Sequence, residues 1–292
     1  MSDMVIGFIG LGDMGGPMAG HIAASGATLV AYDAAPTREA PPGARRAGSV
    51  AEVAQSADVI FLSLPDGSVS RAVAEQIVTA AGRRATAVVE LSTIGPAAAR
   101  LLDLQLAEHG LAFVDSPVSG GRTGAIRGTI AVMWSGPAAL LERLRSVVES
   151  FSGSVFLVGP TPGQGQALKL LNNFLSATAM VATSEAMLFG RRYGLDMGTM
   201  LDVVNVSTGR NTATSDKFPN RILTETYDAG FRMALMAKDV ALYLDEVKKA
   251  GTVCGVGERV AACWKQALGT FPDGDFTEIY KVLAETKTLE RA

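Results

Sequence analysis

The sequence predicts an α/β protein whose first part is a doubly wound, mainly parallel sheet and whose second part is all helical. In the first half, β-branched runs of strand length alternate with alanine-rich segments of helix length, which is typical of βαβ units. After residue 165 the strand-like runs stop, and a long apolar helical pattern begins. The Pro/Gly-rich stretch 159–165 separates the two patterns, so we expect domains at residues 1–162 and 163–292.

Each predicted strand is a short apolar run. In chain order these runs are VIGFIG (5–10), TLVAYD (28–33), DVIFLSL (58–64), TAVVELS (86–92), LAFVDS (111–116), GTIAVMW (128–134) and SVFLVG (154–159). In the second part, residues 166–193 form one continuous helical pattern. Residues 232–250 form an amphipathic pattern, and Gly251 follows it at a position where helices commonly end.

Composition narrows the class of protein. The chain has 292 residues, 48% of them hydrophobic, which is enough for two cores. A net charge of −3 with scattered basic residues argues against a nucleic-acid partner. Two cysteines and two widely separated histidines predict neither a disulfide framework nor a metal site. Residues 170–190 are too polar to span a membrane, and the start lacks the basic region of a signal peptide, so we expect a cytoplasmic protein without a membrane partner.

A glycine-rich turn follows the first predicted strand. Gly10, Gly12 and Gly15 have G-x-G-x-x-G spacing in VIGFIGLGDMGGPM. In a dinucleotide-binding loop these glycines allow, in order, the tight turn, the approach of a pyrophosphate, and close packing of helix on strand. The motif alone is weak, because glycine turns between strand and helix are common. Asp33 strengthens it, because an acid ending the next strand can accept hydrogen bonds from the adenosine ribose.

Asp33 also indicates which nicotinamide cofactor to expect. A carboxylate at this position repels a 2′-phosphate, and the next residue, Ala34, is not basic. The sequence therefore favours NAD. Arg38 lies five residues further on and keeps NADP open as the second possibility.

Further candidates follow the other predicted strands, because the ligand of an open parallel sheet lies beyond the carboxyl ends of its strands. A hydroxyl beside backbone N–H groups suits a small anion such as a carboxylate. An ordinary loop explains these residue types as well, since Ser, Pro and Gly are common in turns. The candidates are Leu64, Pro65 and Asp66 at the end of the third run, Ser92 and Thr93 at the end of the fourth, and Ser119, Gly120 and Gly121 of DSPVSGG after the fifth.

Lys169 is the one charged residue between Glu149 and Glu185, and it stands among leucines at the start of the long helical pattern. On a helix, Lys169 and Asn173 share a face one turn apart. An apolar cleft would favour the neutral amine and lower the pKa of Lys169 toward the working pH, as a general acid or base requires. The alternative is that Lys169 extends to solvent near the helix N-terminus.

Taken in order, the motifs GFIGLGDMGGPM, LSTIGP, DSPVSGG, GQGQALKLLNN and the pair KD at 238–239 resemble those of the β-hydroxyacid dehydrogenase family. The similarity spans nearly the whole chain. It implies a Rossmann-type dinucleotide-binding domain, followed by an all-helical domain for substrate binding and oligomerisation. It also implies NAD(P)-dependent hydride transfer between the cofactor and a small 3-hydroxy acid or its semialdehyde, as in 3-hydroxyisobutyrate dehydrogenases and tartronate semialdehyde reductases.

The resemblance implies roles for individual residues. Lys169 becomes the catalytic acid/base. Asn173 and the loop 119–121 become the substrate site, with the loop holding the carboxylate. Without the resemblance, Lys238 would be a neighbour of Asp239 on a solvated helix face. The implied cofactor contacts are Gly10, Leu11, Gly12, Met14, Gly15, Asp33, Leu64, Pro65, Thr93, Phe231 and Lys238.

The sequence leaves the substrate and some alternatives open. Asn172 stands where 6-phosphogluconate enzymes usually carry His, so a sugar phosphate is not expected, and Arg122 and Arg210 match no motif. Alternatives are an imine reductase on the same fold, a SAM-dependent methyltransferase and a non-catalytic nucleotide-binding module.

A helix of roughly 28 residues would run about 42 Å with several apolar faces, which predicts a homodimer or homotetramer.

Overall fold

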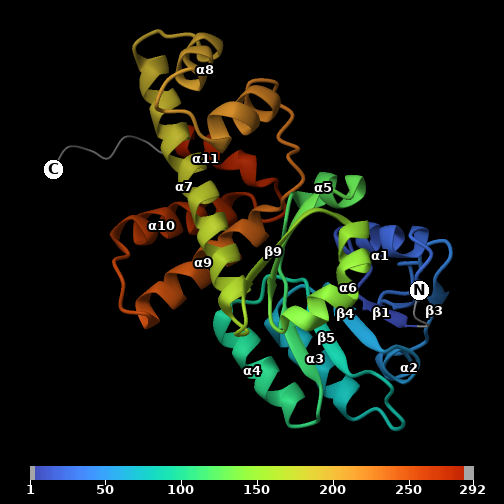
Figure 1. The fold of residues 1–292 in the computed structure, drawn as a ribbon. Helices are drawn as coiled ribbons and strands as arrows, with labels where there is room; N and C mark the ends of the chain where they lie inside the picture. The colour runs from blue at the N-terminus through green and yellow to red at the C-terminus, as the bar shows by residue number, and fades with distance from the viewer. Residues whose placement is uncertain (1–3, 286–292) are drawn as a thin grey trace. The chain divides into compact units, whose positions relative to one another are not determined.

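The computed structural model describes residues 4–285. The chain divides into two compact units, Met1–Lys169 (unit 1) and Leu170–Ala292 (unit 2) (Figure 1). Helix α7 (Gln164–Arg192) begins in unit 1 and continues into unit 2. Because this division falls inside a helix, the domain boundary expected after residue 162 stays a prediction.

Unit 1 is built on a nine-stranded sheet with the order β3-β2-β1-β4-β5-β6-β8-β7, and β9 pairs with β8. Neighbouring strands are parallel, except that β8 runs antiparallel to β6 and β7. All seven predicted strands are present, and the predicted fold class is confirmed. The strands are β1 (Val5–Ile9), β2 (Thr28–Tyr32), β3 (Arg45–Arg46), β4 (Val59–Leu62), β5 (Ala87–Glu90), β6 (Ala112–Asp115), β7 (Val118–Ser119), β8 (Ile130–Ser135) and β9 (Ser152–Gly159).

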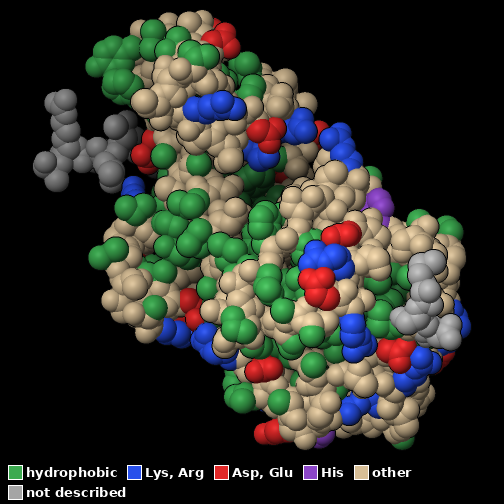
Figure 2. Space-filling model, viewed as in Figure 1, with side chains coloured by type: hydrophobic (Ala, Val, Ile, Leu, Met, Phe, Trp, Pro, Cys, Tyr) green, Lys and Arg blue, Asp and Glu red, His purple; other side chains and the backbone are tan. Residues whose placement is uncertain are grey.

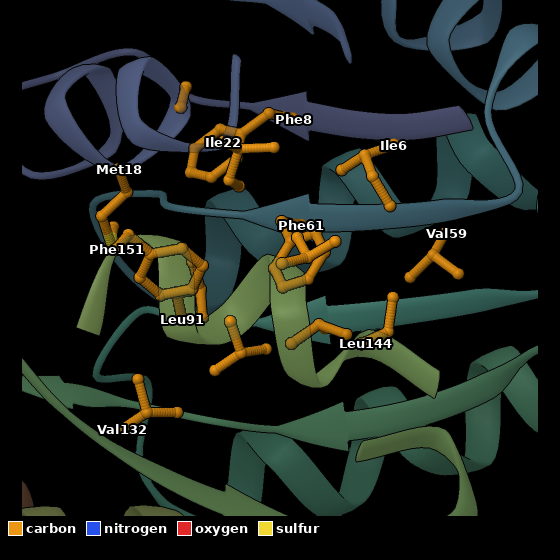
Figure 3. Close-up of a cluster of buried hydrophobic side chains, with 14 of the residues drawn as sticks. Ile6, Phe8, Met18, Ile22, Val59, Phe61, Leu91, Val132, Leu144 and Phe151 are labelled. Carbon is orange, nitrogen blue, oxygen red and sulfur yellow. The ribbon is translucent and has the colours of Figure 1, made fainter. Parts of the chain in front are cut away.

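Both faces of the sheet are buried, which explains why its strands are continuous apolar runs in the sequence. Successive side chains point to opposite faces. Phe8 and Phe61 pack with α1, α5 and α6 on one face, as Figure 3 shows for part of this cluster. Ile60 and Leu62 pack with α2, α3 and α4 on the other. The helices are α1 (Gly15–Ala24), α2 (Val50–Ser56), α3 (Gly67–Val78), α4 (Pro96–Ala107), α5 (Gly121–Arg127) and α6 (Ala138–Ser150).

In its described residues, 170–285, unit 2 consists of helices joined by turns and loops, with one isolated β-bridge between Arg232 and Asp275. Its core includes the fully buried side chains of Trp264 and Phe218. The two predicted helices are confirmed as α7 and α9, and Gly251 follows α9 in the left-handed conformation with φ 68°. The other elements are α8 (Met197–Asn205), a π-helix η1 (Ala213–Ile222), α9 (Met233–Lys249), α10 (Gly255–Thr270), a 3-10 turn η2 (Phe276–Glu278) and α11 (Ile279–Glu285).

Within residues 4–285, the structure has no helix that combines the length and the apolar character needed to cross a bilayer.

Candidate active site

Several candidate residues lie where the parallel strands of unit 1 end, and backbone hydrogen bonds hold these ends in line. The Gly10 N–H donates to the Tyr32 carbonyl at 2.9 Å, and the Ser63 N–H donates to the Ile9 carbonyl at 2.9 Å. The Ser116 N–H donates to the Glu90 carbonyl at 2.8 Å. We call this line of strand ends the carboxyl edge. In an open α/β sheet, this is where ligands bind.

The three glycines after β1 have different surroundings. Gly10 has φ 97°, and a Cβ added to it would lie 2.2 Å from the Ser63 carbonyl oxygen. A Cβ on Gly15 would lie 1.9 Å from the Gly10 carbonyl oxygen. A Cβ on Gly12 would meet no described atom within 4 Å. Gly10 and Gly15 are therefore required by the protein's own packing, whereas the side-chain position of Gly12 faces open space.

The start of α1 suits an anionic group. Its N-cap, Met14, makes no side-chain capping hydrogen bond, and its first turn carries no acidic residue. The first N–H groups of a helix have no partner within the helix, and the helix dipole favours negative charge there. Together with the open side of Gly12, these features fit the pyrophosphate of a dinucleotide.

Asp33 connects the end of β2 to the glycine loop. Its Oδ2 accepts a hydrogen bond from the Leu11 N–H at 2.6 Å, and its Oδ1 accepts one from the Ala35 N–H at 2.8 Å. Arg38 pairs with Asp13 of the glycine loop at 3.4 Å, and both side chains are exposed. The carboxylate of Asp33 therefore fixes the glycine loop to the end of β2.

The ends of β4 and β5 are joined by a side chain. The Leu64 N–H donates to Ser92 Oγ at 2.7 Å, and the Ser92 N–H donates to Glu90 Oε1 at 2.9 Å. Pro65 and Thr93 continue from these two positions along the chain. The structure therefore places Leu64 and the segment containing Thr93 side by side at the carboxyl edge.

The predicted anion loop folds back on the sheet. Ser119 belongs to the short strand β7 and pairs with Ala131 of β8. Gly120 has φ 135° and Gly121 has φ 62°, values that side-chain-bearing residues rarely adopt. The loop therefore makes a tight turn between β7 and α5, and the short strand β7 was not predicted.

Lys169 lies in the second turn of α7 and is 8% exposed, which does not support the alternative that it extends to solvent. The first turn of this helix is bonded to the carboxyl edge through two buried side chains, Asp115 and Gln166. Burial raises the pKa of Asp115 to about 6, although the N–H groups of Gly163 and Gln166 donate to this carboxylate and lower it.

The candidates in unit 2 form a second group. Asn173 Nδ2 donates to Asp239 Oδ2 at 2.6 Å, and Asp239 is 2% exposed. Lys238 pairs with Asp239 Oδ1 at 3.4 Å. Phe231 packs edge-on against Phe276, with ring centroids 5.9 Å apart. Asp239 is buried and the Lys238 side chain is partly buried, which does not support the alternative of a solvated helix face at this pair.

The sequence interpretation assigned no role to three of these contact residues: Asp115, Gln166 and Asp239. Asp239 has a visible signal, because it occupies a position of the amphipathic α9 pattern between the buried Met236 and Val240. Asp115 and Gln166 belong to the motifs DSPVSGG and GQGQALKLLNN, but no local pattern indicates the contacts that they make. Arg122 and Arg210 are exposed. Among residues 4–285, no group of three or more His, Cys, Asp or Glu side chains is placed to hold a metal ion.

Comparison with known proteins gives two family matches that follow each other along the chain. Residues 5–159 match the family described as the NAD binding domain of 6-phosphogluconate dehydrogenase. Residues 163–283 match the family described as NAD-binding of NADP-dependent 3-hydroxyisobutyrate dehydrogenase.

Individual relatives match over most of the chain. The 2-(hydroxymethyl)glutarate dehydrogenase of Eubacterium barkeri is 35% identical, over 85% of this chain and 83% of the relative. The NAD-dependent L-serine dehydrogenase of Pseudomonas aeruginosa is 33% identical, over 97% of this chain and 98% of the relative. The structure of Mycobacterium tuberculosis 3-hydroxyisobutyrate dehydrogenase with L-serine matches with a TM-score of 0.88 at 31% identity, over 96% of this chain and 99% of that one.

An imine reductase from Streptomyces aurantiacus matches with a TM-score of 0.64 at 21% identity, which shows a shared fold alone. The two family matches and the relatives above 30% identity agree with the order of motifs along this sequence. The chain therefore belongs to the β-hydroxyacid dehydrogenase family of NAD-binding oxidoreductases.

Proposed function

We propose that this protein transfers a hydride between NAD and a small 3-hydroxy acid or its semialdehyde, with Lys169 as the general acid/base. The observation that carries the proposal is the burial of Lys169 on a helix whose first turn is bonded to the carboxyl edge. The bound nicotinamide supplies the hydride acceptor. In oxidation, the substrate hydroxyl gives its proton to the neutral Nζ of Lys169. The carbinol carbon loses its hydrogen as hydride, and the bond from this carbon to oxygen becomes C=O. In reduction, the Lys169 ammonium returns the proton to oxygen.

We assign the substrate carboxylate to the loop of Ser119, Gly120 and Gly121. Gly120 and Gly121 both have positive φ and form a tight turn at the start of α5, and successive backbone N–H groups in a turn can bind an anion. We assign Asn173 to the substrate oxygens. The side-chain amide of Asn173 donates a hydrogen bond to the buried carboxylate of Asp239, and this bond fixes the orientation of the amide.

The names of the relatives narrow the proposed substrate class. 2-(Hydroxymethyl)glutarate, L-serine and 3-hydroxyisobutyrate each carry a hydroxymethyl group on the carbon beside a carboxylate. We therefore propose a 2-substituted 3-hydroxypropanoate as the substrate, with a primary alcohol as the reacting group. An imine reductase remains the alternative on this fold. Family membership disfavours a methyltransferase or a module without catalysis.

A panel of purified compounds tests this assignment. The protein is incubated with NAD or NADP and a series of 2-substituted 3-hydroxypropanoates, and the nicotinamide absorbance is followed. We expect NADH formation with at least one member of the series. In the reverse direction, we expect the semialdehyde to be reduced and cyclic imines to be left unchanged. Reduction of the imines without the semialdehydes would favour the alternative instead.

We propose NAD as the preferred cofactor, with NADP as a weaker substrate. Asp33 presents a carboxylate where a 2′-phosphate would lie, and the same carboxylate holds the glycine loop through the Leu11 N–H. The residues of unit 1 that we propose contact the cofactor are Gly10, Leu11, Gly12, Met14, Gly15, Asp33, Leu64, Pro65 and Thr93. Those along unit 2 are Phe231 and Lys238.

Replacing Asp33 with asparagine is expected to lower kcat/KM for NAD and to raise it for NADP. The change removes the charge that repels a 2′-phosphate and replaces one carboxylate acceptor with an amide donor. We expect the ratio of the two kcat/KM values to fall by about tenfold, equivalent to about 1.4 kcal/mol. Asp13→Asn is the matched control, because Asp13 lies on the same loop and pairs with Arg38. An unchanged ratio in Asp33→Asn would exclude the proposed role.

The cytoplasmic location stays a prediction. The oligomeric state, a homodimer or homotetramer, also stays a prediction, and one exposed surface supports it. Leu171, Leu175 and Phe189 are 48–65% exposed, and their spacing places them on one stripe of α7. Tyr193, which is 73% exposed, follows directly after the helix. Figure 2 also shows hydrophobic side chains gathered at the end of unit 2 that carries α8. Exposed apolar patches of this kind commonly mark interaction sites. We propose that a second copy of the chain covers it.

We expect Leu175→Glu and Phe189→Glu each to shift the protein from an oligomer toward a mass of 30.3 kDa in light scattering. A charge placed in the stripe would be desolvated without a partner if a second copy packs there. Leu223→Glu is the control, because Leu223 is 47% exposed and lies outside α7. A wild-type protein that runs as a monomer would contradict the proposal.

A further inference from the structure

The side chain of Gln166 joins α7 to the segment after β5. Gln166 is fully buried. Its Oε1 accepts hydrogen bonds from the Ile94 N–H at 2.9 Å and the Gly95 N–H at 3.1 Å, and its Nε2 donates to the Ser92 carbonyl at 3.0 Å. These three bonds use backbone groups on both sides of Thr93. One amide therefore fixes the conformation of the Thr93 segment and its position against the helix.

Asp115 holds the same turn from the end of β6. Its Oδ1 accepts the Gly163 N–H at 2.9 Å, and its Oδ2 accepts the Gln166 N–H at 2.8 Å. The carboxylate thus caps the helix from a distant strand and binds N–H groups that the helix itself leaves unpaired. A Cβ on Gly165 would lie 2.7 Å from the Met133 carbonyl oxygen and 2.9 Å from Asp115 Oδ2. Only glycine allows the helix to approach the sheet this closely.

Lys169 lies three residues after Gln166, less than one helical turn away. A displacement of the first turn would therefore move Lys169 relative to the carboxyl edge. The Thr93 segment, which we propose contacts the cofactor, is bonded to the same turn. The position of Lys169 relative to the Thr93 segment therefore depends on the Gln166 amide.

We propose that Gln166 is a positioning residue for the reaction: its amide sets the placement of Lys169 relative to the Thr93 segment, with Asp115 supporting the same turn. This inference rests on the proposed role of Lys169. Gln166 itself takes no part in proton or hydride transfer. It acts through two groups that do contact the reactants, so its loss changes their alignment and leaves their chemistry intact.

The central variant is Gln166→Met, which keeps the length of the side chain and removes all three hydrogen bonds. We expect kcat per NADH-binding site to fall by about tenfold to a hundredfold, the scale on which a small misplacement slows a reaction. NADH affinity should stay within about threefold, because the glycine loop and Asp33 are untouched. Dividing kcat by the number of NADH-binding sites removes any loss that comes from misfolded protein.

Gln164→Met is the matched control. Gln164 lies in the same turn, is exposed, and accepts a hydrogen bond from the nearby Thr161 N–H at 3.0 Å. We expect it to match the wild type. Asp115→Asn is the second variant, should Gln166→Met fold poorly, and it should lower kcat per site in the same direction. Hydrogen exchange of residues 93–95 and 163–169 should quicken in Gln166→Met and not in Gln164→Met.

The inference is overturned if kcat per NADH-binding site in Gln166→Met and Asp115→Asn stays within twofold of the control, whatever happens to hydrogen exchange. Lys169→Ala separates this outcome from failure of the proposed function. If Lys169→Ala is inactive while Gln166→Met behaves like the control, the positioning role is wrong and the acid/base role stands. If Lys169→Ala remains active, the acid/base role is wrong, and a faster exchange in Gln166→Met then reports structure alone.

Discussion

Lys169→Ala is expected to lower kcat for a 3-hydroxy acid by about 10²- to 10⁴-fold, the range that a positioned general acid or base contributes. The variant removes the amine that takes the hydroxyl proton and leaves the glycine loop and Asp33 in place. NADH affinity should therefore change little. The measurement is kcat at saturating substrate together with an NADH fluorescence titration of the same preparation.

Two further variants sharpen this result. Lys169→Arg keeps the positive charge, but a guanidinium does not lose its proton in a protein, so it should be as inactive as Lys169→Ala. Lys265→Ala, at an exposed position of α10, should behave as the wild type. Added primary amines should restore part of the activity of Lys169→Ala, with a rate that follows amine basicity. Near-full activity without added amine would show that Lys169 is not the acid/base.

The second large effect is expected at Gly12. Gly12→Val should weaken NADH binding by about a hundredfold, equivalent to about 3 kcal/mol, and leave the melting temperature nearly unchanged. The reason is that a Cβ at Gly12 meets no described atom within 4 Å, so the fold tolerates it, whereas a bound pyrophosphate needs that space. Calorimetric titration with NADH and thermal unfolding are the two measurements.

Two other glycines provide the comparison. Gly15→Ala places a Cβ 1.9 Å from the Gly10 carbonyl oxygen, so it should lower the melting temperature as well as NADH affinity. Gly255→Val, at another position where a Cβ meets no described atom within 4 Å, should change neither. If Gly12→Val bound NADH as tightly as the wild type, the glycine loop would not be the cofactor site.

Much of the fold was predictable from the sequence. Strands that are buried on both faces of a sheet appear in the sequence as continuous apolar runs. Runs such as VIGFI and VIFL have no polar interruption, and the long uncharged stretch around Lys169 could be read as one helix. β3 and β7 were not predicted, because two residues are too few to show an alternating pattern. The place where α7 passes from one unit to the other depends on contacts rather than on local composition.

The candidate site was predictable where its chemistry lies in local motifs, as in the glycine loop and DSPVSGG. It was not predictable where a side chain acts over a long sequence separation. Gln166 binds Ile94 across 72 residues, and Asn173 binds Asp239 across 66 residues. Gln166 lies in an apolar helical run like any other polar residue of that run. Only the folded chain shows that it contacts the segment of Thr93.

The central claim is that the hydride comes from the hydroxymethyl carbon of a 3-hydroxy acid. The most direct measurement uses a 2-substituted 3-hydroxypropanoate carrying deuterium on C3, incubated with the wild-type protein and NAD, followed by mass spectrometry of the reduced cofactor. We predict NADH that carries one deuterium, together with the semialdehyde. Unlabelled NADH, or no NADH from any member of the series, would contradict the claim.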